Sequence, residues 1–468
     1  MLSQDRRMNR RGFLETAGRA TLVGACAGLA PAAASCAAAG TRRKAPNRLP
    51  NIVIVFTDDQ GYQDLGCFGS PDIRTPNIDR MRQEGVKFTD AYVAQPVCGA
   101  SRAALLTGCY PNRIGLLGAP NHTAKHGIHA DEMTIAELVK QKDYATAIYG
   151  KWHLGHLPPF LPTRHGFDEY FGLPYSNDMW PHHPENPGGY PPLPLYENEE
   201  IVNKNVTHED QSHLTTWYSE RACKFIAKNK DRPFFCYVAH SMPHVPLFVS
   251  EKYDGKSKRG LYGDVIEEID WSTGEILKTL RDLGLDEKTL VIYTSDNGPW
   301  LGKGKHGGSA KPLRDGKFHT WEGGFRMPCV MRWPGRIPAG KVCREMALSM
   351  DLAPTIAALA GADLPEDYDM DGASILPLME GRAGAETPHE AFFYYRGKRL
   401  EAVRSGKWKL ILYEGAQKGQ PKKPLELYDL RADISESRNL AADHPDVVKR
   451  LTALAVAGHK RLGGRVGK

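Results

Sequence analysis

Two pairs of oxygen-bearing side chains in this chain directly follow apolar runs. Asp58 and Asp59 follow the first run, and Asp296 and Asn297 follow a run much later in the sequence. Three carboxylates and an amide form a hard, all-oxygen ligand set, which suits calcium or magnesium and does not suit zinc. Adjacent acids after a strand are more often a turn or a helix cap, so it is the second pair that favours a metal site.

Two further apolar runs end in basic and imidazole groups. Lys151 and His153 follow one of them, and His240 and His244 follow the other. In an open α/β sheet, ligands bind outside the carboxyl ends of the strands. A random scatter of polar residues would not place such groups after every run, so the sequence predicts that all of them share one edge.

Cys98 differs from the other cysteines of the chain. Cys26 and Cys36 lie near the N-terminus, and the remaining seven show no tight repeated spacing, so neither a disulfide framework nor a zinc knuckle is predicted. Cys98 begins the sequence Cys-Gly-Ala-Ser-Arg-Ala-Ala-Leu-Leu-Thr-Gly. A generic cysteine here would be a buried residue before a short helix. A nucleophile in this place would instead hold negative charge near a helix N-terminus, where free amides favour anions.

The apolar runs have the pattern of strands buried on both faces of a sheet. Residues 51–56 form a continuous, mostly β-branched run. Similar apolar runs occur at residues 145–149, 234–239 and 290–294. Helical patterns lie between or after these runs, at residues 134–142, 264–283 and 351–360. Strands that alternate with helices predict an α/β fold with a mainly parallel sheet. Residues 156–200, rich in Pro, Gly, His and aromatics, are expected to form loops around the site.

The pattern changes towards the C-terminus. Short strand-like segments occur at residues 391–395, 401–404, 407–413 and 425–429. A helical pattern follows them at about residues 446–462. They predict a smaller antiparallel domain with a terminal helix. We therefore expect three parts, namely a leader at residues 1–44, a catalytic α/β domain at 45–380 and a smaller domain at 381–468.

The segment that begins at Cys98 resembles the signature of the sulfatase family, in which that cysteine is oxidised to formylglycine. Other segments look like family landmarks in family order, namely residues 151–155, 166–168, 174–176, 243–246 and 295–298, and Lys317 before 322–324. The resemblance covers about residues 50 to 440 and is closest to the arylsulfatase A and N-acetylgalactosamine-6-sulfatase branch. It implies an alkaline-phosphatase-like fold, with a large mixed sheet flanked by helices and a small C-terminal antiparallel sheet.

The resemblance also implies a role for each candidate residue. The ligands of one calcium ion would be Asp58, Asp59, Asp296 and Asn297. The formylglycine at position 98 and a sulfate oxygen of the substrate would complete the ligand set. Arg102 and Lys151 would orient the formylglycine, Lys151 would also contact the substrate, and His153 would remove the proton from a hydroxyl of the formylglycine.

The remaining implied roles concern the ester. His244 and Lys317 would bind its sulfate and protonate the leaving alcohol, with Ser176 as a further sulfate contact. His240 lies off the aligned position and is either structural or substrate-facing. A hydrated aldehyde has two hydroxyls on one carbon, so one can attack sulfur and the other can later expel the bound sulfate. A formylglycine-generating maturation enzyme is therefore an expected partner.

Two other functions remain open from the sequence. A phosphatase, phosphodiesterase or phosphonate hydrolase would share the fold and the metal edge, but a two-metal phosphatase needs extra His or Asp ligands and has Ser or Thr where Cys98 stands. A non-catalytic sulfoglycan-binding protein is the second alternative, against which the full catalytic set argues. The expected substrate is a sulfated carbohydrate, because residues 175–196 combine polar groups with aromatic rings, with aryl sulfates as the alternative.

The net charge of +6 arises entirely near the N-terminus. Residues 1–44 contain eight Lys or Arg and two acidic residues, and charges in the rest of the chain cancel, so nucleic-acid binding is not expected. The basic start precedes an uncharged Ala/Gly-rich stretch at residues 20–39 and contains Arg10-Arg11, which resembles the twin-arginine export motif. We expect an exported, periplasmic or extracellular protein without a stable membrane span. A membrane anchor and lipidation at Cys36 are the alternatives.

Overall fold

The computed structural model describes residues 49–364, 367–412 and 425–462. The predicted leader, with Arg10, Arg11 and Cys36, lies outside these residues. In the described part of the chain, no helix combines the length and apolar character needed to cross a bilayer. The predicted boundary between residues 380 and 381 stays a prediction.

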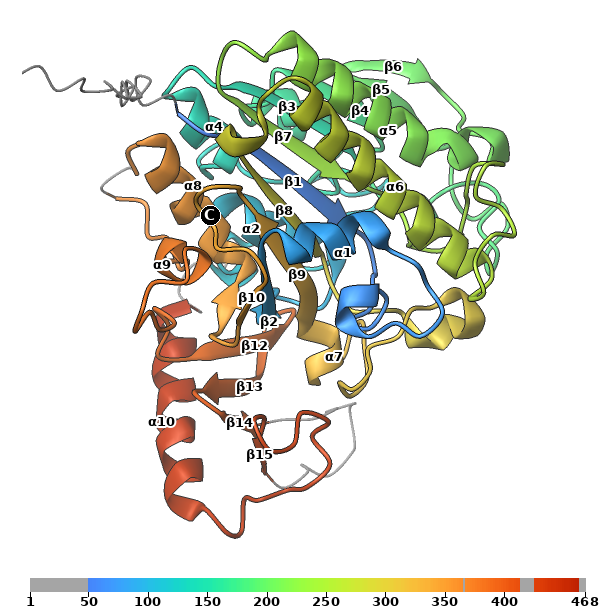
Figure 1. Ribbon diagram of the computed structural model, residues 1–468. Helices are drawn as coiled ribbons and strands as arrows, with labels where there is room; N and C mark the ends of the chain where they lie inside the picture. Colours follow the sequence, from blue (N-terminus) through green and yellow to red (C-terminus); the bar gives the residue numbers. More distant parts are fainter. Residues whose placement is uncertain (1–48, 365–366, 413–424, 463–468) are drawn as a thin grey trace, which may run out of the picture. The chain divides into compact units, whose positions relative to one another are not determined.

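Eleven strands of the described residues form one large mixed sheet (Figure 1). Ten of them follow in space the order β10 (Lys341–Cys343), β2 (Val86–Tyr92), β9 (Arg326–Arg332), β8 (Thr289–Ser295), β1 (Asn51–Thr57), β7 (Phe234–Ala239), β3 (Ala145–Gly150), β4 (Glu169–Gly172), β5 (Leu195–Glu197) and β6 (Glu200–Asn203). The eleventh strand, β11 (Ala347–Leu348), pairs with β2. The central strands from β8 to β4 are parallel, whereas β9 pairs antiparallel with both of its neighbours.

Helices cover both faces of the sheet because the side chains of each buried strand alternate between the faces. In β1, Val53 and Val55 belong to the core under α1 (Pro76–Gln83), α5 (His208–Lys228) and α6 (Leu261–Asp282). The other strand residues, Ile52, Ile54 and Phe56, belong to the core under α2 (Cys98–Thr107), α4 (Ile135–Lys140) and α8 (Leu352–Ala360). Three short helices of the described chain are α3 (Pro111–Ile114), α7 (Glu322–Phe325) and α9 (Leu376–Met379).

A second, antiparallel sheet follows in the chain. Its strands, in spatial order, are β12 (Phe392–Arg396), β13 (Arg399–Ser405), β14 (Trp408–Ile411) and β15 (Glu426–Asp429). The terminal helix α10 (Pro445–Leu462) contacts β13 and β14 and runs beside this sheet in Figure 1. Phe392 and Tyr394 pack with Tyr92 of β2 and Phe325 of α7 in one apolar cluster, which joins the small sheet to the large one.

The predicted α/β class, with a large mixed sheet and a small antiparallel sheet, is confirmed, and every predicted strand is present to within about two residues. The structure also contains elements that were not predicted. Strands β2 and β9 were missed, although both lie inside the large sheet. The 21-residue helix α5 was also missed, and residues 156–200, expected as loops, contain β4 and β5. In β2, Lys87, Thr89 and Asp90 interrupt the apolar run, so its sequence lacks the continuous apolar pattern of β1.

Candidate active site

The site residues predicted from seven separate segments converge at one edge of the large sheet. They come from the ends of β1 (Asp58 and Asp59), β3 (Lys151 and His153), β7 (His244) and β8 (Asp296 and Asn297), from the first turns of α2 (Cys98 and Arg102), and from the segments after β4 (Ser176) and before α7 (Lys317). All eleven are buried in the described structure. The edge is therefore a buried cluster of opposite charges and not an open polar surface.

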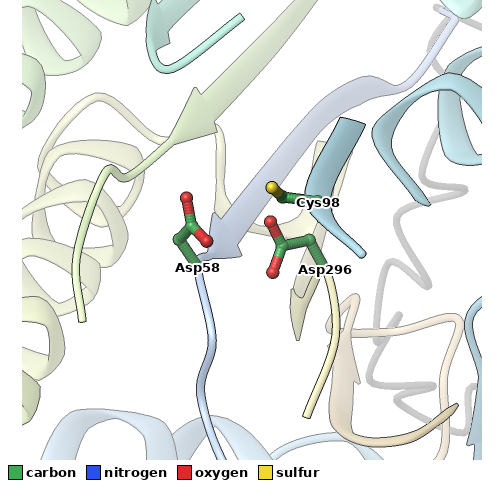
Figure 2. Close-up of side chains that lie close together, drawn as sticks. All are labelled: Asp58, Cys98 and Asp296. Carbon is green, nitrogen blue, oxygen red and sulfur yellow. The ribbon is translucent and has the colours of Figure 1, made fainter. Parts of the chain in front are cut away.

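Cys98 is the first residue of α2 and faces two carboxylates. Its Sγ and one carboxylate oxygen each of Asp58 and Asp296 lie within 4.8 Å of one another, and Figure 2 shows the three side chains pointing towards the same point. The residue before the helix, Val97, offers no side-chain cap. The positive end of the α2 dipole is therefore directed at this cluster, where it favours negative charge.

These residues have the oxygen donors that calcium requires. Asp58 Oδ1 and Asn297 Oδ1 are buried and have no hydrogen-bond partner among the described residues. Buried polar atoms are rarely left without a partner, so both atoms have unused capacity to bind a cation. Asn297 Nδ2 donates to Asp59 Oδ1 at 2.7 Å, and this contact directs the amide oxygen away from Asp59. The residues present therefore fit a single hard cation.

Two basic side chains neutralise the carboxylates next to Cys98. Arg102 Nη2 lies 2.8 Å from Asp296 Oδ2 and 3.3 Å from Asp58 Oδ2, and Arg102 Nη1 donates to the backbone oxygen of Lys151 at 3.0 Å. Lys151 Nζ pairs with Asp58 and donates to Ser176 Oγ at 3.2 Å. Each of these pairs is fully desolvated, which fixes its geometry more strongly than an exposed pair would.

A second set of contacts surrounds Asp59. Lys317 Nζ lies 2.8 Å from Asp59 Oδ1, and His244 Nε2 lies 3.5 Å from Asp59 Oδ2. The other ring nitrogen, His244 Nδ1, lies 2.6 Å from the backbone oxygen of Val245. If Nδ1 carries a proton for this carbonyl, Nε2 is the nitrogen that faces the site.

The charges in the cluster shift the pKa values of its carboxyl groups in opposite directions. Burial disfavours the charged form of Asp58, but Lys151, His244 and Arg102 outweigh burial and hold its pKa below the usual range. Burial and the neighbouring Asp58 charge raise the pKa of Asp296 to about 7, against the opposing effect of Arg102. The two carboxylates thus compete for the same positive charge, and an additional cation would stabilise both in the ionised form.

The two remaining imidazoles differ in their surroundings. Neither ring nitrogen of His153 has a hydrogen-bond partner among the described residues, and burial together with the Lys151 charge keeps its pKa well below 6.5. His240 is also fully buried, but its Nε2 lies 3.2 Å from Ser272 Oγ of α6, and burial lowers its pKa to about 3. His153 lies with the site residues, whereas His240 is held against α6.

Unusual backbone conformations occur where the site residues begin. Asp59 and His153 have positive φ values of 65° and 61°, in a region that non-glycine residues seldom adopt. Gly150 precedes Lys151 with φ of 126°, and a Cβ there would lie 1.8 Å from the backbone oxygen of Ala239. Glycine therefore allows β3 and β7 to approach closely enough to bring Lys151 and the residues after β7 to one edge.

Two polar or aromatic residues beside the site were not predicted as functional. Asp178 lies two residues after Ser176, and Trp300 lies three residues after Asn297 with its ring centroid 5.8 Å from that of His244. Both line a pocket of about 400 Å³ next to the site. Their nearness in sequence to predicted site residues was the signal that could have identified them.

Known proteins that are similar to this chain over most of its length are sulfatases. The Sulfatase family model matches residues 50–362, and the model of the C-terminal region of N-sulphoglucosamine sulphohydrolase matches residues 314–456. N-acetylgalactosamine-6-sulfatase of Canis lupus familiaris is 41% identical over 389 residues, covering 80% of this chain and 73% of that protein. Arylsulfatase A of Homo sapiens is 38% identical over 452 residues, covering 87% of each chain. The crystal structure of Ps i-CgsB has a TM-score of 0.77 at 33% identity and covers 88% of this chain and 93% of that one.

Proposed function

The chain belongs to the sulfatase family and hydrolyses sulfate esters, and we propose that it does so through a formylglycine made from Cys98 beside one calcium ion. The observation that carries the proposal is the position of the Cys98 side chain at the start of α2, against Asp58 and Asp296. Burial raises the pKa of the Cys98 thiol. An unmodified Cys98 would therefore form little of the thiolate that a cysteine nucleophile requires.

Five residues would hold the calcium ion, namely Asp58, Asp59, Asp296, Asn297 and the formylglycine at position 98. Their oxygens match the preference of calcium for carboxylate and amide donors, and two of those oxygens have spare capacity. A bound calcium ion supplies positive charge that stabilises negative charge developing on the sulfate oxygens. Arg102 and Lys151 hold the carboxylates in place by ion pairs. The cluster thereby fixes the approach of an anionic ester to position 98.

A hydrated formylglycine offers two hydroxyls on one carbon, one to attack sulfur and one whose deprotonation restores the aldehyde. His153 is the residue that would accept the proton of this second hydroxyl. Its imidazole is neutral near pH 7, because burial and Lys151 lower its pKa, and both ring nitrogens are without partners among the described residues. A neutral imidazole can take a proton at one of these nitrogens.

His244, Lys317 and Ser176 would bind the sulfate and assist the leaving alcohol. Lys317 Nζ remains charged, since the nearby carboxylates, Asp59 foremost, outweigh burial and raise its pKa. His244 Nε2 faces the same side of the site as Lys317, because both contact Asp59. These two groups can therefore bind the ester oxygens together, and the charged Lys317 has a proton to donate to the departing oxygen.

We propose that the substrate is a sulfated carbohydrate. Ps i-CgsB, a structural relative of this chain, has been crystallised with k-i-k-neocarrahexaose, and relatives of similar sequence are named N-acetylgalactosamine-6-sulfatases. Within residues 175–196, His183 lines the pocket beside the site. Trp180 does not, because it is 1% exposed and packs against His182, His208 and Phe248, so its ring orders the segment.

Sulfate release from a broad panel of sulfated mono- and oligosaccharides, aryl sulfates and matched phosphate mono- and diesters would test this function. We expect sulfate esters to be cleaved with the highest kcat/KM, and at least one sulfated sugar to exceed simple aryl sulfates, because contacts to the sugar can stabilise the transition state. Faster turnover of phosphodiesters would favour the phosphodiesterase alternative. Cleavage of aryl sulfates alone would reject the carbohydrate substrate but not the sulfatase activity.

We further propose that the protein is exported by the twin-arginine route and modified before export. The route carries folded proteins, whereas Cys98 is fully buried in the folded chain and out of reach of a maturation enzyme. Conversion by a formylglycine-generating enzyme would therefore precede folding and export. A periplasmic or extracellular location would also place the enzyme among sulfated polysaccharides.

A further inference from the structure

A pocket of about 400 Å³ begins beside the proposed sulfate-binding groups. It lies between the segment after β4 and the segment after β8, and its walls include Asp178, His183, Trp300 and Lys303. Its size falls within the roughly 300–1,000 Å³ typical of small-molecule sites. Val245, next to His244, also lines it. An alcohol leaving from a sulfate held by His244 and Lys317 would therefore extend into this pocket.

Asp178 is the carboxylate of this pocket that lies nearest the proposed sulfate-binding groups. It follows Ser176 by two residues, and its side chain is only 15% exposed. Burial opposes its charge, but His244 and Lys151 outweigh burial and keep its pKa below the usual range. Lys317 acts in the same direction. Asp178 is thus an ionised carboxylate stabilised by two of the proposed sulfate-binding groups, His244 and Lys317, and by Lys151.

His183 faces this carboxylate. Its Nδ1 accepts the backbone N–H groups of Glu185 and Asn186, both at 3.1 Å, so in the neutral ring the proton is on Nε2. That nitrogen lies 3.8 Å from Asp178 Oδ2, which is beyond hydrogen-bond distance but close enough for an N–H dipole to favour the carboxylate. Asp178 Oδ1 has no hydrogen-bond partner among the described residues. The carboxylate therefore has unused capacity to accept hydrogen bonds.

We propose that Asp178 is a specificity-determining residue, which accepts a hydrogen bond from a neutral hydroxyl or amide N–H next to the sulfate ester. This inference rests on the proposed function. An ionised, mostly buried carboxylate is stabilised by a donor and destabilised by a second anion at the same place. The substrate class that fits is a sugar whose carbon next to the ester carries a free hydroxyl or an amide. A second sulfate or a carboxylate at that carbon would be disfavoured.

Three small aryl sulfates test this inference without knowledge of the natural sugar. They are phenyl sulfate, 2-hydroxyphenyl sulfate, which carries a donor next to the ester, and 2-carboxyphenyl sulfate, which carries an anion there. The measurement is kcat/KM for each compound with the wild-type enzyme, Asp178→Ala and Asp178→Asn. Comparison of ratios between enzymes cancels the intrinsic reactivity of each leaving group. Glu185→Gln is the matched control, because Glu185 lines the same pocket but is 67% exposed.

We expect the preference for 2-hydroxyphenyl sulfate over phenyl sulfate to fall about 10-fold or more in Asp178→Ala, as for a lost hydrogen bond to a charged group. Asp178→Asn should also raise relative turnover of 2-carboxyphenyl sulfate, and Glu185→Gln should keep the wild-type ratios. Unchanged ratios in both Asp178 variants, or an equal change in Glu185→Gln, would overturn the role of Asp178 while sulfatase activity stands. Absence of hydrolysis of all sulfate esters by the wild-type enzyme would reject the proposed function itself.

Discussion

Lys409→Met tests how the small sheet supports the segment that carries Lys317. Lys409 Nζ, on β14, lies 3.0 Å from Glu322 Oε1 and 2.7 Å from Glu436 Oε1, and it donates to the backbone oxygen of Thr320 at 2.9 Å. All three charged side chains are fully buried. Methionine has a similar length but no charge, so the variant leaves two buried carboxylates without this partner.

The expected loss of stability follows from what remains around each carboxylate. Removal of one partner from a buried ion pair costs about 3–5 kcal/mol. Glu322 keeps hydrogen bonds from Tyr92 and Tyr394 and an ion pair with Arg326. Burial already raises the pKa of Glu436 to about 7, so this group can take up a proton when Lys409 is lost. We therefore expect a cost near the lower limit, about 3 kcal/mol in the free energy of unfolding.

Urea unfolding at neutral pH measures this cost, with Lys407→Met as the control. Lys407 pairs with Asp429 but is 43% exposed, so its removal should cost at most about 1 kcal/mol. Because Lys409 holds Thr320 and Glu322 close to Lys317, the variant should also raise KM for sulfate esters. If Lys409→Met unfolded at the same urea concentration as Lys407→Met, the buried network would not carry the stability assigned to it.

Three further predictions concern pH, calcium and export. Burial raises the pKa of Asp270 to about 6, although Ile78 and Asn77 donate backbone N–H groups to it. The protonated carboxyl group therefore stabilises the folded protein, and this contribution is lost as pH rises from about 4 to 6. Relative to Asp270→Asn, the wild-type free energy of unfolding should decline over that interval, and a constant difference would contradict the assignment. Calcium should raise the Tm of the wild-type protein but not of Asp296→Ala, and an equal rise in both would exclude Asp296 as a ligand. Replacing Arg10 and Arg11 by Lys should retain the protein in the cytoplasm, and undiminished export on cell fractionation would reject the twin-arginine leader.

Much of the site was predictable because its residues follow strands with an unambiguous pattern. β1, β3, β7 and β8 are buried on both faces, so their sequences are continuous apolar runs, and the polar residues after them had to lie at one edge. Cys98 and Lys317 are not at strand ends. Their assignment depended on the family resemblance.

Other features depend on contacts that a linear pattern does not contain. The antiparallel β9 joins β2 to β8 over a long separation in sequence, and neither β2 nor β9 was recognised. Asp178 lies two residues after Ser176, but its charge depends on side chains from three other segments, which the linear sequence does not place beside it. Trp180 is the opposite case, since its position in an aromatic-rich segment suggested a sugar contact, whereas the structure places its ring in the core.

The most direct test of the central claim is mass spectrometry of the peptide that contains residue 98, on protein whose sulfatase activity has been measured. Preparations with different degrees of conversion should have specific activities proportional to the fraction of formylglycine, and Cys98→Ala should fold but release no sulfate. Full activity in a preparation whose residue 98 is entirely cysteine would contradict the proposed mechanism.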